Sequence, residues 1–196
     1  MRLLISALMC TALMLASNTT IAESCQKSTD LWLDLPIAIR TGDVAAFDCL
    51  IGQVSDINGA DPADLWENRL LHYAARYNRQ AFAALLIQRG AKPDLPNAAD
   101  KTAARIAVDQ GSTQTLAFLL DQGANLEAPD TEGRTLLFWA VAEDDPVTTK
   151  LLLDRGANPD AIFTSGERPA SIRDYVQKRG KTDIINLFNS YRESKP

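Results

Sequence analysis

Apolar residues recur at helical spacing in two short stretches near the middle of the chain. The apolar positions of the first stretch are Leu70, Leu71, Tyr73 and Ala74. Those of the second stretch are Phe82, Leu85 and Leu86. Apolar residues three and four positions apart form one side of an amphipathic helix. The pattern therefore predicts two short helices that pack together as an antiparallel pair.

The ending of this helix pair returns twice at a fixed interval. Gly90, Gly123 and Gly156 are 33 residues apart, and they close the similar segments LLIQRG, FLLDQG and LLLDRG. The same interval relates the residues ahead of each first helix, which are Arg69, Thr102, Thr135 and Arg168. A period of this length is typical of repeat proteins, in which each unit buries its apolar face against its neighbours.

Each unit also needs a sharp turn between its two helices. The residues at that point are Asn78, Gly111 and Asp144, with Gly42 and Gly180 in similar places near the two ends. Glycine, asparagine and aspartate adopt the left-handed backbone conformation at the lowest cost. We therefore expect left-handed residues at these turns and at the glycines that follow the second helices.

These units resemble the ankyrin repeat, which combines a Thr-Pro-Leu-His-x-Ala-Ala segment with a Leu-Leu-Leu-x-x-Gly-Ala ending. The best copies are RLLHYAARYN and GRTLLFWAVAED, whereas KTAARIAVDQG lacks the Pro-Leu-His residues. The resemblance implies an all-α solenoid of about five helix-turn-helix repeats with degenerate end caps. The domain it implies covers 35–192, with repeats at about 35–60, 64–96, 97–129, 130–162 and 163–192.

The single histidine, His72, stands at the histidine position of the ankyrin pattern. An imidazole there usually hydrogen-bonds loop backbone, so the resemblance implies a structural role. One histidine leaves little basis for a zinc site or a Ser-His-Asp group. The sequence also contains no phosphate-binding glycine loop, GxSxG, HExxH or CxxC motif. We expect no catalytic activity, no cofactor and no metal site.

The first 22 residues have the layout of a secretory signal peptide. Arg2 precedes an apolar run at 3–16, which is followed by polar residues and the small residue Ala22. The run is shorter than the roughly 20 residues that a membrane-spanning helix needs, so a retained anchor is the less favoured alternative. We predict a signal peptide at 1–22, an N-terminal segment at 23–34 and a location in a bacterial periplasm.

Two cysteines, Cys25 and Cys49, would remain after removal of the signal peptide, because Cys10 lies within its apolar run. In an exported protein, two cysteines suggest one disulfide. We therefore predict a Cys25–Cys49 disulfide, with two free thiols as the alternative.

The charge balance excludes some partners. The net charge is −5, and signal cleavage would remove only one charged residue, Arg2. An acidic chain is a poor ligand for nucleic acid or anionic lipid. We expect a monomer that binds another protein and, once the signal is removed, does not insert into a membrane.

In ankyrin-repeat proteins, which this chain resembles, partners bind to a concave face formed by hairpin tips and first helices. The residues that the resemblance places on this face are Leu65, Trp66, Asn68, Arg76, Tyr77, Lys101, Asp109, Gln110, Glu132, Arg134 and Glu143.

Aromatic residues near this face have two interpretations. Trp66 is a candidate anchor for a partner, since nothing in the fold requires an indole at a hairpin tip; the alternative is a lid that folds back over the first repeat. Phe163 is a second candidate for an exposed aromatic residue. We expect Tyr73, Ile106 and Trp139 to lie in the core.

Two functional hypotheses follow from the resemblance to small periplasmic ankyrin proteins. The first is an adaptor or chaperone-like partner of a periplasmic enzyme, for example in oxidative-stress defence. The alternative is an immunity protein that neutralises a toxin, with an acidic groove that binds a basic effector. An enzyme is the least favoured hypothesis.

Overall fold

The computed structural model describes residues 30–165 and 168–193. The predicted signal peptide at 1–22 and Cys25 lie outside these residues, as does most of the predicted N-terminal segment. The described residues divide into two compact units, with the boundary between residues 56 and 57.

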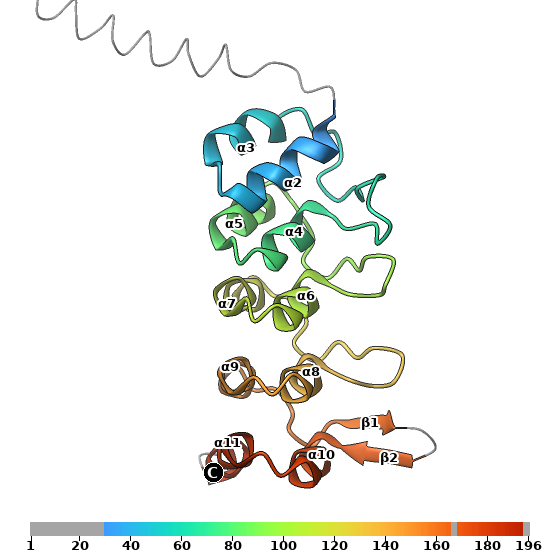
Figure 1. Cartoon of the computed structure of the whole chain (residues 1–196), viewed down its shortest axis with the longest axis vertical. Coiled ribbons are helices and arrows are strands. Elements are labelled where there is room, and N and C mark those ends of the chain that lie inside the picture. The colour runs from blue at the N-terminus through green and yellow to red at the C-terminus, as the bar shows by residue number, and fades with distance from the viewer. Residues whose placement is uncertain (1–29, 166–167, 194–196) are drawn as a thin grey trace, which may run out of the picture. The chain divides into compact units, whose positions relative to one another are not determined.

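The described part of the first unit contains one helix pair, α2 (Leu31–Thr41) and α3 (Val44–Ile51) (Figure 1). Helix α2 packs against α3. The carboxylate of Asp30 accepts the backbone N–H of Leu33, and that of Asp43 accepts the N–H of Ala46, so side chains cap both helices. Between them Gly42 has a φ of 83°, which confirms the predicted left-handed turn.

The second unit contains four helix pairs in its described part. They are α4 (Leu70–Arg76) with α5 (Gln80–Gln88), α6 (Ala103–Asp109) with α7 (Thr113–Asp121), α8 (Leu136–Ala142) with α9 (Pro146–Asp154), and α10 (Ile172–Arg179) with α11 (Thr182–Glu193). The starts of α4, α6 and α8 are 33 residues apart, as the sequence period predicts.

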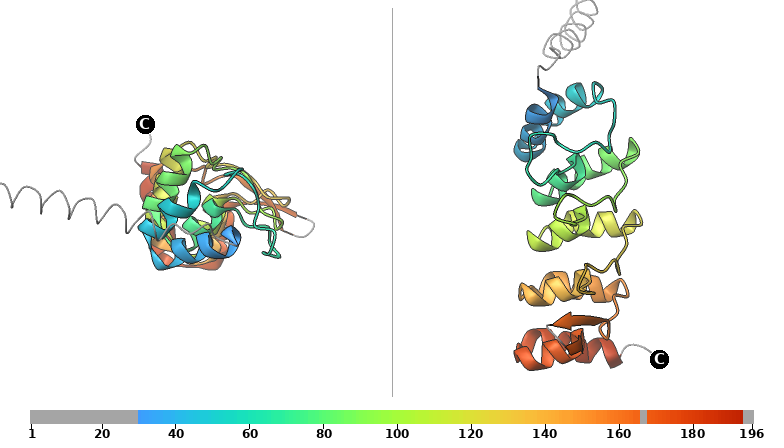
Figure 2. Two further views of the ribbon diagram at one scale, coloured as in Figure 1. Left: turned by 90° about the horizontal axis from the view of Figure 1, so that it is seen from above. Right: turned by 90° about the vertical axis from the view of Figure 1, so that its right-hand side faces the viewer.

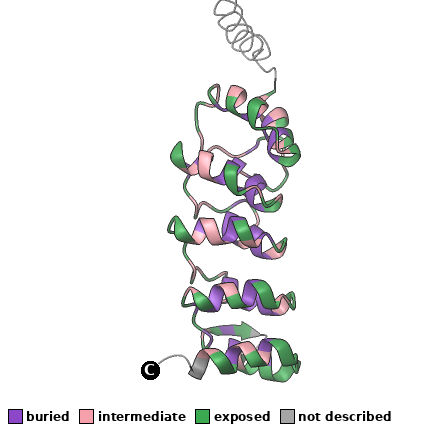
Figure 3. Cartoon of the chain, turned by 90° about the vertical axis from the view of Figure 1, so that its left-hand side faces the viewer, coloured by how far each residue is buried: buried purple, intermediate pink, exposed green. Residues whose placement is uncertain are grey.

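These helices form two layers (Figure 1). In one layer α4 packs on α6, α6 on α8 and α8 on α10; in the other, α5, α7, α9 and α11 follow one another in the same way. Helices α5, α7, α9, α10 and α11 have a buried side and an exposed side, as an amphipathic pattern requires, whereas α4, α6 and α8 are buried along most of their length (Figure 3).

The core of the second unit is periodic as well. Fully buried alanines recur in the first helices at Ala74, Ala107 and Ala140. Fully buried leucines recur in the second helices at Leu86, Leu119 and Leu152. Each buried leucine side chain contributes about 1.5–3 kcal/mol through loss of apolar contact with water. Equivalent positions therefore stabilise each repeat of the stack.

The predicted turns have the predicted backbone conformation. The residues between paired helices, Asn78, Gly111, Asp144 and Gly180, all have positive φ, as do Gly90, Gly123 and Gly156 after the second helices. Positive φ also occurs at Glu67, Asp100 and Gly133, which are 33 residues apart in the loops before the first helices. Two of these three residues, Glu67 and Asp100, therefore adopt a conformation that glycine adopts more readily.

The loops before the first helices project to the same side of the stack (Figure 2). The last of them is a two-stranded antiparallel ribbon, β1 (Ile162–Ser165) and β2 (Arg168–Ser171). The prediction that Phe163 is exposed is wrong, because only 3% of this residue is exposed. Its ring lies 4.4 Å from that of Phe138 and 5.8 Å from that of Tyr175, measured between centroids.

Within residues 30–165 and 168–193, no helix is both long and apolar enough to cross a bilayer.

Candidate protein-binding face

A repeated hydrogen-bond pattern orders the loops that precede α4, α6 and α8. The side chains of Asp64, Asn97 and Asp130 each accept the backbone N–H two residues later, at 2.8 to 2.9 Å. Asn97 and Asp130 also accept the N–H four residues later. This is the Asx-turn geometry that asparagine and aspartate favour. We call the surface formed by these loops and by α4, α6 and α8 the hairpin face.

Adjacent loops are joined to one another. The Ala98 N–H donates to the Trp66 carbonyl at 2.8 Å, and the Thr164 N–H donates to the Glu132 carbonyl at 2.8 Å. A side-chain bond of 3.0 Å runs from Asn97 Nδ2 to Asn68 Oδ1. Neighbouring loops of the hairpin face therefore support one another.

His72 links the second predicted repeat to the next loop. Its Nδ1 accepts the Arg69 N–H at 3.0 Å, so Nε2 carries the proton and donates to the Lys101 carbonyl at 3.0 Å. Burial lowers the pKa of His72 to about 4, which keeps the imidazole neutral at pH 7. The predicted structural role of His72 is confirmed by these contacts.

A buried polar cluster lies beneath the first of these loops. The Tyr73 hydroxyl lies 2.9 Å from Asp61 Oδ2 and 2.6 Å from Asp64 Oδ2. Burial, reinforced by these two carboxylates, raises the pKa of Tyr73. Burial alone would also raise the pKa of Asp64, but hydrogen bonds from Tyr73, Asn68 and the Trp66 N–H outweigh it and lower that pKa. Tyr73 lies in the core as predicted, and it holds the base of the loop.

Five of the predicted binding residues meet around one cavity. This Trp66 cavity has a volume of about 200 Å³. The predicted residues that line it are Trp66, Arg76, Lys101, Asp109 and Gln110. They come from two loops and from the ends of α4 and α6, so packing of neighbouring repeats brings them together.

A second cavity of about 490 Å³ lies beside the first, and we call it the Trp139 cavity. The predicted residues that line it are Lys101, Asp109, Arg134 and Glu143. Lys101 and Asp109 line both cavities and form an ion pair of 2.8 Å. The cavities therefore share one wall.

The remaining predicted residues have different environments. Leu65 is 93% exposed at the loop tip beside Trp66. Tyr77 is half-buried at the end of α4, and Glu132 is exposed and pairs with Arg134 at 2.8 Å. None of these three lines either cavity.

The assignment of Asn68 to the binding face needs correction. Asn68 is only 1% exposed. Its amide donates to Asp64 Oδ2 at 2.8 Å, and its carbonyl oxygen accepts from Asn97. A side chain with both polar atoms used internally supports the loop and cannot contact a partner.

The sequence prediction missed two residues of the hairpin face, Arg105 and Trp139. Trp139 was expected in the core but is half-buried and lines the Trp139 cavity. The Arg105 guanidinium carbon lies 3.5 Å from the Trp139 ring centroid, and that of Arg134 lies 4.4 Å from it. Such cation–π contacts contribute about 0.5–2 kcal/mol each. The sequence feature that could have indicated this contact is Arg105, an arginine at the position equivalent to His72.

Arg105 is also held by a carboxylate. Its Nε donates to Asp109 Oδ1 at 2.8 Å. Burial lowers the pKa of Arg105, and the negative charge of Asp109 opposes that effect. The guanidinium therefore stays charged and fixed over the indole.

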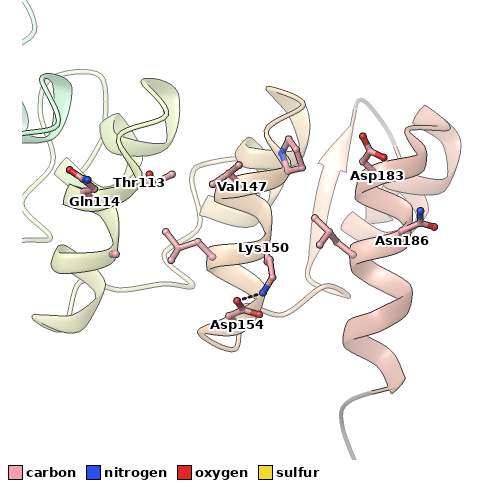
Figure 4. A pocket seen from close by; sticks show the side chains of 11 residues that line it. Thr113, Gln114, Val147, Lys150, Asp154, Asp183 and Asn186 are labelled. Atoms are coloured by element: carbon pink, nitrogen blue, oxygen red, sulfur yellow. Dashed lines mark hydrogen bonds and ion pairs between the residues drawn. The ribbon is translucent and has the colours of Figure 1, made fainter.

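A larger apolar groove of about 730 Å³ lies on the other helix layer, across α7, α9 and α11 (Figure 4). The residues along it include Ala117, Val147, Leu151 and Leu187. Lys150 and Asp154 pair at 2.6 Å within it. None of the predicted binding residues lies in this groove.

Among the described residues, no group of three or more histidine, cysteine, aspartate or glutamate side chains is arranged to hold a metal ion.

The stacked helix pairs define a helical repeat protein. Residues 71–162, a little under half of the chain, match the family model described as ankyrin repeats (3 copies). This stretch therefore consists of ankyrin repeats, which are modules for protein–protein interaction and are generally not catalytic. No curated protein matches the chain.

Proposed function

We propose that this chain is a non-catalytic binding protein that acts in a bacterial periplasm as an adaptor or chaperone-like partner of an enzyme. It binds its partner through the hairpin face. The periplasmic location rests on the sequence of residues 1–22, and the proposed Cys25–Cys49 disulfide fits the same compartment.

The exposed apolar tip at Leu65 and Trp66 is the observation that carries the proposal. These residues are 93% and 57% exposed, although both are large and apolar. A lid would require a buried indole, so this exposure favours the anchor interpretation of Trp66. Tryptophan is among the side chains that contribute most to protein interfaces when a partner covers them.

The charge of the hairpin face favours an adaptor over an immunity protein. The two cavities are lined by Arg76, Lys101, Arg105 and Arg134 and by Asp100, Asp109, Asp130 and Glu143. This balanced lining does not offer the acidic groove that a basic toxin would need for strong electrostatic steering.

Affinity capture from the protein's own periplasm tests the proposal. The mature wild-type chain, cross-linked mildly, should retain one partner that a Leu65→Ala plus Trp66→Ala variant loses. Val147→Ala is the matched control, because Val147 is 66% exposed on the other helix layer. Loss of the partner with the control but not with the double variant would refute binding at the hairpin face.

The export proposal has its own test. Intact mass of the unreduced protein from the periplasm should match a chain that starts at Glu23 and contains one disulfide. A mass that includes residues 1–22 would refute signal cleavage, and alkylation of both cysteines without reduction would refute the disulfide.

A further inference from the structure

The Trp66 cavity has the size of a pocket for one side chain; three of its eight lining residues are apolar, and the other five are polar or charged. Its walls include the Trp66 indole and Ala99, together with Ile106, which is only 4% exposed. Its volume of about 200 Å³ is below the range of roughly 300–1,000 Å³ that is usual for small-molecule and cofactor sites. A single residue of a protein partner fits this volume better than a cofactor does.

One cation at the edge of this cavity is unpaired. Arg76 is exposed at the end of α4, and its guanidinium forms no hydrogen bond or ion pair within the part of the chain that the structure describes. Its positive charge acts on Asp64. However, Asp64 already accepts hydrogen bonds from Tyr73, Asn68 and the Trp66 N–H.

The other cations of the two cavities differ from Arg76 in this respect. Lys101 and Arg105 share the carboxylate of Asp109, each at 2.8 Å. Arg134 pairs with Asp130 at 2.8 Å. Among the described residues that line the two cavities, Arg76 is thus the guanidinium without a paired carboxylate, and its donors are available to a partner.

The local charge has the opposite sign to that of the whole chain. Arg76, Lys101 and Asp109 are the charged residues that line the Trp66 cavity, which leaves it with an excess of one positive charge. The whole chain has a net charge of −5. A guanidinium presents paired N–H donors that match the two oxygens of a carboxylate.

We propose that the Trp66 cavity recognises an apolar side chain of the partner protein together with a carboxylate beside it. The apolar side chain enters between Trp66 and Ile106, and the carboxylate pairs with Arg76. This inference rests on the proposed function of the hairpin face and names the chemistry of its ligand. The carboxylate belongs either to the C-terminus of the partner or to an adjacent aspartate or glutamate.

Three small probes separate the contributions of the apolar group and the charge. N-acetyl-phenylalanine carries a chain-end carboxylate, its primary amide carries none, and acetyl-phenylalanyl-glutamic acid amide carries a side-chain carboxylate. Each is titrated into the ¹⁵N-labelled mature protein, and binding is followed at the indole N–H of Trp66. A Trp66→Phe variant assigns that resonance among the three tryptophans.

At least one of the two acids should bind about tenfold more tightly than the neutral amide, because a charge-assisted hydrogen bond strengthens its contact. In Arg76→Gln this preference should disappear. Lys92→Gln is the matched control, since it removes one exposed positive charge from a residue that does not line the cavity. This control should keep the tenfold preference.

Equal binding of the acids and the amide to the wild-type protein would overturn the inference. So would absence of binding by all three probes, or a preference that persists in Arg76→Gln. Whichever acid shows the preference identifies the source of the carboxylate. If Arg76→Gln still captures the periplasmic partner and Leu65→Ala plus Trp66→Ala does not, the proposed function stands and this inference fails.

Discussion

Replacing His72 by glutamine should remove a pH dependence of stability that the wild-type protein shows between pH 4 and 6.5. The pKa of His72 is lowered from 6.5 to about 4 in the folded protein, mainly because burial disfavours the charged imidazolium. The Arg69 charge adds to this effect, whereas the hydrogen bond to the Lys101 carbonyl and the Asp64 charge oppose it.

The sign follows from proton binding. Below pH 6.5 the unfolded chain takes up a proton on this imidazole and the folded chain does not, so falling pH favours the unfolded state. The His72 contribution is fully present above pH 6.5 and is lost as the pH falls to about 4. Since a tenfold difference in proton affinity corresponds to about 1.4 kcal/mol, the total loss is about 3 kcal/mol.

A glutamine at position 72 keeps part of the hydrogen-bond geometry of His72 but does not titrate. At the third residue of a helix, a glutamine side chain can accept the backbone N–H of the capping residue, as His72 Nδ1 does with Arg69. We expect His72→Gln to lower the free energy of unfolding by about 1–2 kcal/mol at pH 7, through weaker hydrogen bonds.

Urea unfolding at a series of pH values, followed by circular dichroism, measures the effect. Wild type and His72→Gln share every carboxylate, so the difference between their unfolding free energies reports His72 alone. The wild-type advantage should shrink as the pH falls below 6.5 and reverse by pH 4, because the loss of about 3 kcal/mol exceeds the advantage at pH 7. Since the chain contains one histidine, NMR of the untagged protein reports its imidazole directly. A constant difference across this range, or an NMR titration midpoint near 6.5, would refute the reasoning.

Two further predictions concern the loops of the hairpin face. Gly133→Ala should lower the free energy of unfolding by about 1–3 kcal/mol in urea, because Gly133 has a φ of 79° and an added Cβ would lie 3.0 Å from the Ile162 carbonyl oxygen. At the equivalent position, the reverse change Glu67→Gly should be neutral or should stabilise the protein by up to about 1 kcal/mol, because Glu67 has a positive φ. Stabilisation by Gly133→Ala would contradict the argument. Asn68→Ala should cost about 1–3 kcal/mol in the same assay, because it leaves the buried Asn97 amide without its Asn68 acceptor, and an unchanged midpoint would show that Asn68 does not support the loop.

The repeated part of the fold could be predicted because its causes are local. The 33-residue period fixes which residues end each helix, and only a few residue types enter the left-handed conformation at low cost. Asn78, Gly111 and Asp144 differ as letters yet have φ values of 53°, 61° and 59°. The core alanines and leucines recur for the same reason, since each unit packs on an equivalent neighbour.

Burial at the hairpin face could not be predicted from the period alone, because it depends on residues about one repeat away. Asn68 and Phe163 were both expected to be exposed. Asn68 is buried, and hydrogen bonds to Asp64 and to Asn97 in the next loop satisfy its amide. Phe163 is buried because its ring packs on Phe138 of the preceding repeat. Equivalent positions therefore share a backbone conformation but do not share an environment.

Trp139 shows the converse. Its equivalents Tyr73 and Ile106 are buried, at 8% and 4% exposure, whereas Trp139 is half-buried and its ring contacts two guanidinium groups. An indole is larger than either equivalent, and the Arg105 side chain in the preceding repeat provides a surface for it. The contact with Arg105, which lies one repeat earlier, thus accompanies the partly exposed position of Trp139.

The loop that carries Trp66 is ordered without any partner, and this order bears on how it can bind. The backbone N–H of Trp66 is held by Asp64, and its carbonyl accepts from the Ala98 N–H. Asp64 is held in turn by Tyr73 and Asn68. A loop fixed in this way loses little conformational entropy when a partner covers it, so more of the interaction energy remains as affinity. Substitution of Asn68 should consequently weaken partner binding through the position of the Trp66 indole, although Asn68 itself is buried and cannot reach the partner.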